Sequence, residues 1–323
     1  MREPDFLPPS GFDLPRFAGV PTFMRLPHVP PNDARRAKVE VGLIGVPWDG
    51  GTTNRPGARH GPRALRDAST MIRAENGTTG IRPFEVMRCA DLGDVGPNPT
   101  DQADTLARIA AFYREIAAVG IRPLSAGGDH LCTLPILRAL GADRPLALIQ
   151  FDSHSDLYAG YFGGASETHG TPIRRAVEEG LIDTARSIQI GLRGTAYDRE
   201  DRDFAATHGL RQVPVEELFA RGVATVMAEA RDLVGGADAY VSFDIDAVDP
   251  AYAPGTGTPE VGGPTSFDAL QMVRGLSGMR IAGADLVEVS PPFDVGGATA
   301  YLGASLMFEL LCIMAGERVG EGP

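Results

Sequence analysis

The chain has 323 residues, of which 43% are hydrophobic and 22% are charged. These fractions are typical of a globular protein with a large buried core, and they exclude a disordered or collagen-like chain. The net charge of −12, from 30 basic and 42 acidic residues, leaves no overall basic surface, so nucleic acid and membranes are poor candidates as partners.

The cysteines and the N-terminal segment indicate a protein of the cytoplasm. Cys89, Cys132 and Cys312 are an odd number without CxxC spacing, so neither a disulfide framework nor a zinc finger is expected. The segment MREPDFLPPSGFDLPRF lacks the apolar core of a signal peptide, and no window approaches about 18 uninterrupted apolar residues. We therefore expect a cytoplasmic protein that is neither exported nor embedded in a membrane.

The chain divides into an N-terminal arm and one catalytic domain. Residues 1–37 are rich in proline, which favours extended segments over helices and predicts an arm that lies on the surface of its own or a neighbouring subunit. No repeat or break in composition divides residues 38–323, so these residues are expected to form a single domain.

Within that domain, short apolar runs alternate with amphipathic helical patterns. The predicted strands cover residues 39–46, 84–89, 122–126, 146–151, 188–192, 239–243 and 281–287. The predicted helices cover residues 101–119, 134–140, 171–179, 215–221, 223–234, 266–275 and 298–314, the first of them capped by Thr100. This alternation predicts an α/β fold with three layers, α/β/α, and a mostly parallel central sheet.

Two histidines and four aspartates directly follow three of the predicted strands. They are His130 after strand 122–126, Asp152, His154 and Asp156 after strand 146–151, and Asp244 and Asp246 after strand 239–243. The carboxyl ends of parallel strands meet at one edge of a sheet, so these side chains are expected to lie together. Clustered aspartates repel one another unless a positive charge lies between them, so the pattern predicts bound metal.

The donor atoms indicate which metals this edge would hold. Carboxylate and imidazole ligands without a thiolate suit Mn²⁺ best, with Ni²⁺, Co²⁺ or Zn²⁺ as alternatives. Four carboxylates carry more negative charge than one divalent ion balances, so we expect two ions. A pair of divalent ions lowers the pKa of water and supplies hydroxide for hydrolysis at neutral pH.

Six motifs, in chain order, resemble the ureohydrolase family of arginases, agmatinases, guanidinobutyrases, guanidinopropionases and proclavaminate amidinohydrolase. They are GGDH (127–130), FDSHSD (151–156), THGTP (168–172), SFDIDAVDP (242–250), GTGTPE (255–260) and ADLVEVSP (284–291). The arm segment 15–27 and the stretch NRPGARHGP (54–62) resemble the agmatinase and guanidino-acid branch. The resemblance implies an arginase-like α/β/α fold, a two-manganese site, hydrolysis of a guanidino group to urea and an amine, and assembly into homo-trimers or hexamers.

The resemblance also implies roles for the clustered residues. It places His130, Asp152 and Asp156 on one ion and His154 and Asp246 on the second, with Asp152, Asp156 or Asp244 bridging in part. We leave the division between the ions open.

Two further residues complete the expected catalytic set, together with Asp156. Glu288 matches the glutamate that binds the guanidinium, because a carboxylate accepts two parallel N–H bonds from that planar cation. His169 matches the histidine that shuttles a proton, and an imidazole suits proton delivery to the leaving amine at neutral pH.

Substrate choice is expected to depend on the loop at residues 157–167, LYAGYFGGASE. Tyr158 and Tyr161 are its candidate substrate-binding residues, and Leu157 follows Asp156 where arginases carry an asparagine that binds the amino-acid head group. We therefore expect a guanidino compound other than arginine, with 4-guanidinobutyrate first and agmatine second. Guanidinopropionate, a small alkylguanidine and formiminoglutamate are further alternatives.

The sequence disfavours two interpretations from other classes of protein. A non-catalytic or regulatory subunit with this fold would have lost metal ligands, whereas all six are present here, and a separate partner subunit stays an open alternative. A deacetylase with a related fold would use a single metal, which His130 and the second aspartate of Asp244 and Asp246 disfavour.

Overall fold

Eight parallel strands form one sheet in the part of the chain that the computed structural model describes, residues 3–319. The strand order is β2-β1-β3-β8-β7-β4-β5-β6. The strands are β1 (Val41–Gly45), β2 (Cys89–Asp94), β3 (Arg122–Ala126), β4 (Ala147–Phe151), β5 (Ile188–Leu192), β6 (Arg211–Pro214), β7 (Asp238–Asp244) and β8 (Arg280–Val287). The predicted parallel sheet is thus confirmed.

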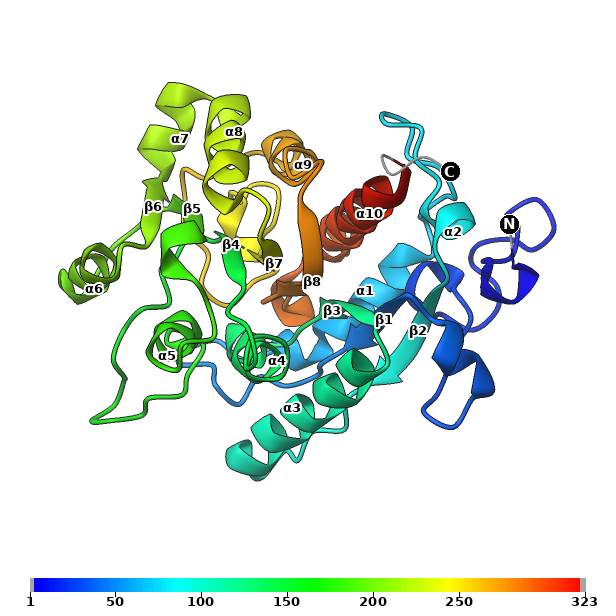
Figure 1. The fold of residues 1–323 in the computed structure, drawn as a ribbon, viewed down its shortest axis with the longest axis horizontal. Helices are drawn as coiled ribbons and strands as arrows, with labels where there is room; N and C mark the ends of the chain where they lie inside the picture. The colour runs from blue at the N-terminus through cyan, green and yellow to red at the C-terminus, as the bar shows by residue number, and fades with distance from the viewer. Residues whose placement is uncertain (1–2, 320–323) are drawn as a thin grey trace.

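Helices cover both faces of the sheet (Figure 1). Helices α3, α4 and α5 pack side by side on one face, and α7, α8, α9, α10 and α1 follow one another on the other. The helices are α1 (Gly61–Ser69), α2 (Pro83–Val86), α3 (Gln102–Ala118), α4 (Thr133–Leu140), α5 (Pro172–Glu178), α6 (Glu200–His208), α7 (Val215–Arg221), α8 (Val223–Val234), α9 (Ser266–Arg274) and α10 (Ala298–Val319). This is the expected three-layer α/β/α arrangement.

Each face of the sheet has its own hydrophobic core. Neighbouring residues of β1 show the division, because Leu43 belongs to the core shared with α10 and Ile44 to the core shared with α3. All five residues of β1 and all five of β4 are buried, as expected for strands covered on both faces. This double burial explains why the strands read as continuous apolar runs.

The strand predicted at 84–89 is wrong. Pro83 begins a short helix, α2, because its fixed φ and missing N–H suit the first helical turn. The strand starts only at Cys89, which pairs with Val41, and continues to Asp94. The cap of α3 is also one residue later than predicted, because Asp101 rather than Thr100 accepts from the backbone N–H of Asp104.

Besides α2, the helices α1 and α6 and the strand β6 were not predicted, since each buries little apolar surface. Helix α6 buries only Ala205, and α1 buries Leu65 as its one large apolar side chain. Strand β6 has four residues at the edge of the sheet, of which only Val213 is buried. Elements with so few apolar positions carry a weak periodic signal.

Helix α10 is long and apolar enough, over Ala298–Glu317, to cross a membrane by length and composition. In this structure 83% of that apolar stretch is buried within the protein. It packs against α1, α9, α2 and β8, as the core helix of a globular protein does.

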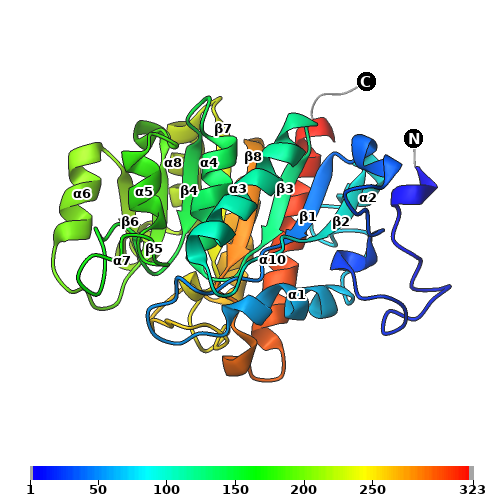
Figure 2. The same ribbon diagram turned by 90° about the horizontal axis from the view of Figure 1, so that it is seen from below.

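The N-terminal segment packs against its own chain. Phe23 and Leu26 are buried in the core on the α10 side of the sheet, while Phe12 and Phe17 are exposed. The backbone N–H of Phe23 donates to Asp91 at 2.9 Å, which ties the segment to β2. The loops after β1, β7 and β8 lie together at the carboxyl edge of the sheet (Figure 2).

Glycine is required where two of these loops touch. Gly128, just after β3, lies against the backbone of Trp48, and the N–H of Asp129 donates to the Trp48 carbonyl at 2.8 Å. A Cβ at position 128 would overlap that carbonyl oxygen. The close approach places His130 at the edge of the sheet.

We therefore expect Gly128→Ala to lower the free energy of unfolding by about 2 kcal/mol or more, since backbone must move to admit the methyl group. Urea denaturation measures this loss. Gly236→Ala is the matched control, because a Cβ there meets nothing within 4 Å. Equal stability of the two variants would contradict the proposed close contact.

Candidate metal centre and active site

The structure brings all six predicted ligand side chains together at the carboxyl edge of the sheet. Five of them are buried and His154 is partly exposed. Two groups have ligand atoms within 4.8 Å of one another: His130, Asp152 and Asp244, and Asp152, His154 and Asp246. Asp152 belongs to both groups, which is the arrangement that a pair of ions sharing one carboxylate requires.

The imidazole of His130 faces three carboxylates. Its Nδ1 atom is buried and has no hydrogen-bond partner among the described residues. The nearest carboxylate oxygens lie 2.8 Å away on Asp156, 3.1 Å away on Asp152 and 3.4 Å away on Asp244. An unpartnered ring nitrogen surrounded by carboxylate oxygens fits a divalent ion between them. Asp156 is in neither three-residue group but contacts His130 directly.

Hydrogen bonds from His130 through Ser242 to Asp285 determine which ring nitrogen of His130 is free to bind a metal ion. Its Nε2 lies 2.8 Å from the Ser242 hydroxyl, which donates to Asp285 at 2.7 Å. Tyr240 and Thr133 also donate to Asp285, each at 2.7 Å. Because the Ser242 proton is directed to Asp285, its oxygen accepts from Nε2–H of His130. The lone pair is therefore on Nδ1, toward the metal site.

The second imidazole, His154, lies beside Asp246. Its Nδ1 is 3.1 Å from Asp246 Oδ2 and 3.7 Å from Asp152 Oδ1. The hydroxyl of Ser153 donates to Asp246 Oδ1 at 2.7 Å, and the Thr258 hydroxyl donates to Oδ2 at 3.3 Å. Ser153 thus holds a candidate ligand, a role that its place between Asp152 and His154 did not reveal.

The electrostatics of the cluster favour bound cations. Burial and the charges of Asp246 and Asp152 raise the pKa of Asp244 well above its ordinary value. Burial also raises the pKa of Asp156 to about 6. Carboxylates in this state resist ionisation until positive charge is placed between them. Two divalent ions would supply that charge, so the residues present fit the metals implied by the resemblance.

Glu288 and His169 form a pair beside the metal site. Glu288 is buried, and its Oε1 accepts from the backbone N–H of His130 at 3.0 Å and lies 2.8 Å from Nδ1 of His169. The other nitrogen of His169 lies 2.8 Å from the Thr53 hydroxyl. Burial lowers the pKa of His169, but the charge and hydrogen bond of Glu288 outweigh burial and raise it to about 9.

Two site residues hold a left-handed backbone conformation that only glycine adopts without strain. The φ angles are 55° at Asp156 and 62° at Glu288. Each costs about 1 kcal/mol or more, and surrounding contacts must hold it in place. At Glu288 one such contact is the backbone N–H, which donates to the Gly128 carbonyl at 2.8 Å.

A cavity of about 110 Å³ opens onto this site. Three tyrosines line its outer part, and their ring centroids lie 5.7–6.2 Å apart in edge-to-face pairs. Tyr158 and Tyr161 were predicted to line the site, while Tyr197 was missed because nothing near it in sequence marks it. Thr53 and Thr258 also line the cavity; Thr258 lies in the GTGTPE motif, which could have signalled it.

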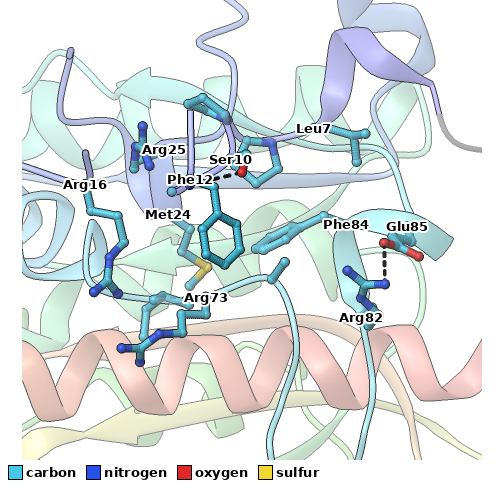
Figure 3. Close-up of a pocket in the computed structure, with 15 residues that line it drawn as sticks. Leu7, Ser10, Phe12, Arg16, Met24, Arg25, Arg73, Arg82, Phe84 and Glu85 are labelled. Carbon is cyan, nitrogen blue, oxygen red and sulfur yellow. Dashed lines mark hydrogen bonds and ion pairs between the residues drawn. The ribbon is translucent and has the colours of Figure 1, made fainter. Parts of the chain in front are cut away.

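Among the described residues, no lysine or arginine lines this cavity. Arg25 lines a different and larger cavity, of about 530 Å³, between the N-terminal segment and the domain (Figure 3). There Phe12 faces Phe84 and Met24, and none of the proposed catalytic residues contributes. A substrate tail in the candidate site would therefore meet tyrosine hydroxyls rather than a basic side chain from this chain.

Comparison with known proteins identifies the family. The site and fold together define a candidate binuclear metal centre on a three-layer α/β/α scaffold. The Arginase family model matches residues 39–312, and the chain belongs to that family. The predicted resemblance to the ureohydrolases is confirmed.

The chain is similar to several members of the expected branch. It is 56% identical to a guanidinopropionase of Pseudomonas aeruginosa over 95% of this chain and 96% of the relative. It is 46% identical to a guanidinobutyrase of the same organism over 96% and 97%. The solved structure of proclavaminate amidino hydrolase from Streptomyces clavuligerus superposes with a TM-score of 0.89 at 40% identity, covering 94% of this chain and 99% of that one.

We expect two divalent ions per chain after loading with Mn²⁺ and desalting, because the ligand atoms form two groups. Elemental analysis measures the ratio. Asp246→Ala should retain about one ion, since it alters the second group only, and Asp152→Ala should lose both because Asp152 is shared. A single ion in the unaltered protein, or two in Asp246→Ala, would contradict the assignment.

The pKa of His169 is the second measurable consequence. In the metal-free protein we expect His169 to titrate near pH 9, because Glu288 stabilises the imidazolium. In Glu288→Gln the pKa should fall, since burial lowers it and the largest opposing charge is gone. NMR titration of the ring protons follows both. The ring signals of His208, an exposed histidine in α6 outside the site, serve as the internal reference in both proteins.

Proposed function

We propose that this protein hydrolyses a short guanidino acid to urea and an amine, using two divalent metal ions. The observation that carries the proposal is the shared position of Asp152 in two ligand groups next to the pair of Glu288 and His169. Arginase-family membership supports the reaction class, and two of the relatives reported above are named guanidinopropionase and guanidinobutyrase.

Each residue of the site has a distinct task in this reaction. The two ligand groups hold the ions, which when bound lower the pKa of water and so provide the nucleophile. Glu288 binds the guanidinium through its carboxylate and holds the central carbon over the metal site. His169 carries a proton on Nδ1 next to Glu288, while its Nε2 accepts from the backbone N–H of Thr53 at 3.2 Å, and the ring delivers a proton to the leaving amine.

The cavity supports a short substrate with a carboxylate tail. Tyr161 and Tyr197 line the cavity, and their hydroxyls are the groups that would donate to a carboxylate there. Burial raises the pKa of Tyr161, which keeps its hydroxyl protonated. With the similarity to guanidinopropionase and guanidinobutyrase, this favours guanidinopropionate, followed by 4-guanidinobutyrate.

Agmatine is the alternative substrate that a specific observation favours. Three tyrosine rings surround the outer cavity, and aromatic faces attract an ammonium group. Arginine is disfavoured because its head group carries both charges and would need a dedicated partner for each.

We also propose Mn²⁺ as the metal, with Ni²⁺ or Co²⁺ as alternatives, since every candidate ligand atom is oxygen or imidazole nitrogen. The protein is proposed to act in the cytoplasm as a homo-oligomer. The exposed apolar side chains of Phe12, Phe17 and Val20 on the N-terminal segment support contact with another copy.

Urea release by the metal-loaded protein tests the function. We expect the highest kcat/KM on guanidinopropionate, then 4-guanidinobutyrate and agmatine, with little turnover of arginine. No urea from any of these would contradict the reaction class, and a clear preference for agmatine would contradict the carboxylate tail.

Tyr161→Phe tests how the tail is recognised. We expect its kcat/KM on guanidinopropionate to fall about tenfold relative to agmatine, equivalent to roughly 1.4 kcal/mol, because only the carboxylate loses a hydrogen-bond donor. Tyr252→Phe, outside the cavity, is the control. An equal loss on both substrates would place Tyr161 in general catalysis instead.

A further inference from the structure

Three buried or half-buried glutamines form a chain across neighbouring strands beneath the metal site. Gln212 on β6 donates to Gln189 on β5 at 2.8 Å, and Gln189 donates to Gln150 on β4 at 2.5 Å. Gln150 then donates to Oδ2 of Asp152 at 2.7 Å. The strand register places the three glutamines directly beside one another.

The direction of the chain follows from the charge at its inner end. An ionised Asp152 only accepts hydrogen bonds, so Gln150 must present its NH₂ group to it. The carbonyl of Gln150 then faces Gln189, which must also present NH₂, and the same holds for Gln212. All three amide dipoles therefore point their positive ends toward Asp152, and aligned hydrogen bonds strengthen one another.

The chain ends on the carboxylate that both ligand groups share. Asp152 Oδ2 accepts from Gln150, and Oδ1 accepts from the backbone N–H of His154 at 2.7 Å. One hydrogen bond to each oxygen fixes the plane of the carboxylate and leaves a further lone pair on each oxygen for a metal ion. Gln189 also donates to the Ser155 carbonyl at 2.6 Å, which holds the loop that carries the neighbouring ligands.

We propose that Gln150, Gln189 and Gln212 act together as positioning residues that orient Asp152 for metal binding. The inference rests on the metal centre proposed above. The three glutamines do not touch the guanidino substrate, since none lines the catalytic cavity. Their effect is on metal affinity, and through it on the fraction of protein that is loaded.

Titration calorimetry of the metal-free full-length protein with Mn²⁺ tests the proposal. Gln150→Met should weaken Mn²⁺ binding about tenfold or more, the usual cost of losing a group that orients a ligand. Gln212→Leu, which touches neither a ligand nor the ligand loop, should weaken binding roughly two- to threefold, because the polarisation it supplies reaches Asp152 only through the other two amides.

The double variant distinguishes a chain from independent effects. Combined with Gln150→Met, Gln212→Leu should cause no further loss, since the link to Asp152 is already broken. The proposal would be overturned if the losses of Mn²⁺ affinity in the two single variants multiplied in the double variant. It would also be overturned if Gln212→Leu bound Mn²⁺ as tightly as the unaltered protein. If Gln150→Met does not fold, Gln189→Met takes its place in the same comparison, with the same expected loss of coupling.

Two controls separate positioning from general weakening of the core. Ser125→Ala, on β3 of the same sheet, removes a buried hydrogen bond to Tyr113 in α3. Gln271→Leu removes a half-buried glutamine in α9 that is not one of the three linked glutamines. Both should bind Mn²⁺ like the unaltered protein, whatever their urea stability. Weakened binding in either control would overturn the proposal. Failure of the unaltered protein to bind Mn²⁺ would instead remove the metal centre itself.

Discussion

Mutual repulsion among buried carboxylates is the constraint around which the catalytic edge is built. Asp152, Asp156, Asp244 and Asp246 are each buried, and Glu288 lies against the same cavity. Without cations, burial and neighbouring charges hold the pKa of Asp244 far above its usual range. The cost of confining these groups is offset when positive charge lies between them, which is why the cluster is a candidate metal centre.

The polar groups that contact the candidate ligands are of two kinds, a hydrogen-bond acceptor for the imidazole and hydrogen-bond donors for the carboxylate. His130 is held by an acceptor, because the Ser242 hydroxyl donates its hydrogen bond to Asp285 and its oxygen accepts from Nε2–H, which leaves the lone pair on Nδ1 facing the carboxylates. Asp152 is backed by donors, from Gln150 and the backbone of His154. Ser242 and Gln150 lie on the strands β7 and β4, where they are paired in the register, while the N–H of His154 comes from the loop after β4. Strands therefore carry the side chains that orient the candidate ligands, while Tyr158 and Tyr161, which line the cavity, lie in a loop.

The local pattern of the chain was sufficient to predict most strands, the three-layer fold and the clustering of six ligands. This was so because strands buried on both faces leave long apolar runs, and because parallel strands bring their carboxyl ends to one edge. The same reasoning failed at residues 84–89, where Pro83 favours a helical turn over the strand that apolar content indicated. It also failed to predict α1, α6 and β6, because these elements bury little apolar surface.

The amino-acid sequence alone determined the candidate ligand set, because those residues follow strands and the spacing of two within 152–156 and 244–246 is a local property, and its motifs carried the resemblance to the family. Only the tertiary structure decided which side chains support them. The strand order β8-β7-β4-β5-β6 places Ser242 beside His130 and brings Gln212 into the same row as Gln150. Tyr197 lines the cavity because its loop, far away in the chain, lies next to the loop with Tyr158 and Tyr161. Strand order depends on how whole helices and strands pack on one another, and no local pattern of residues encodes it.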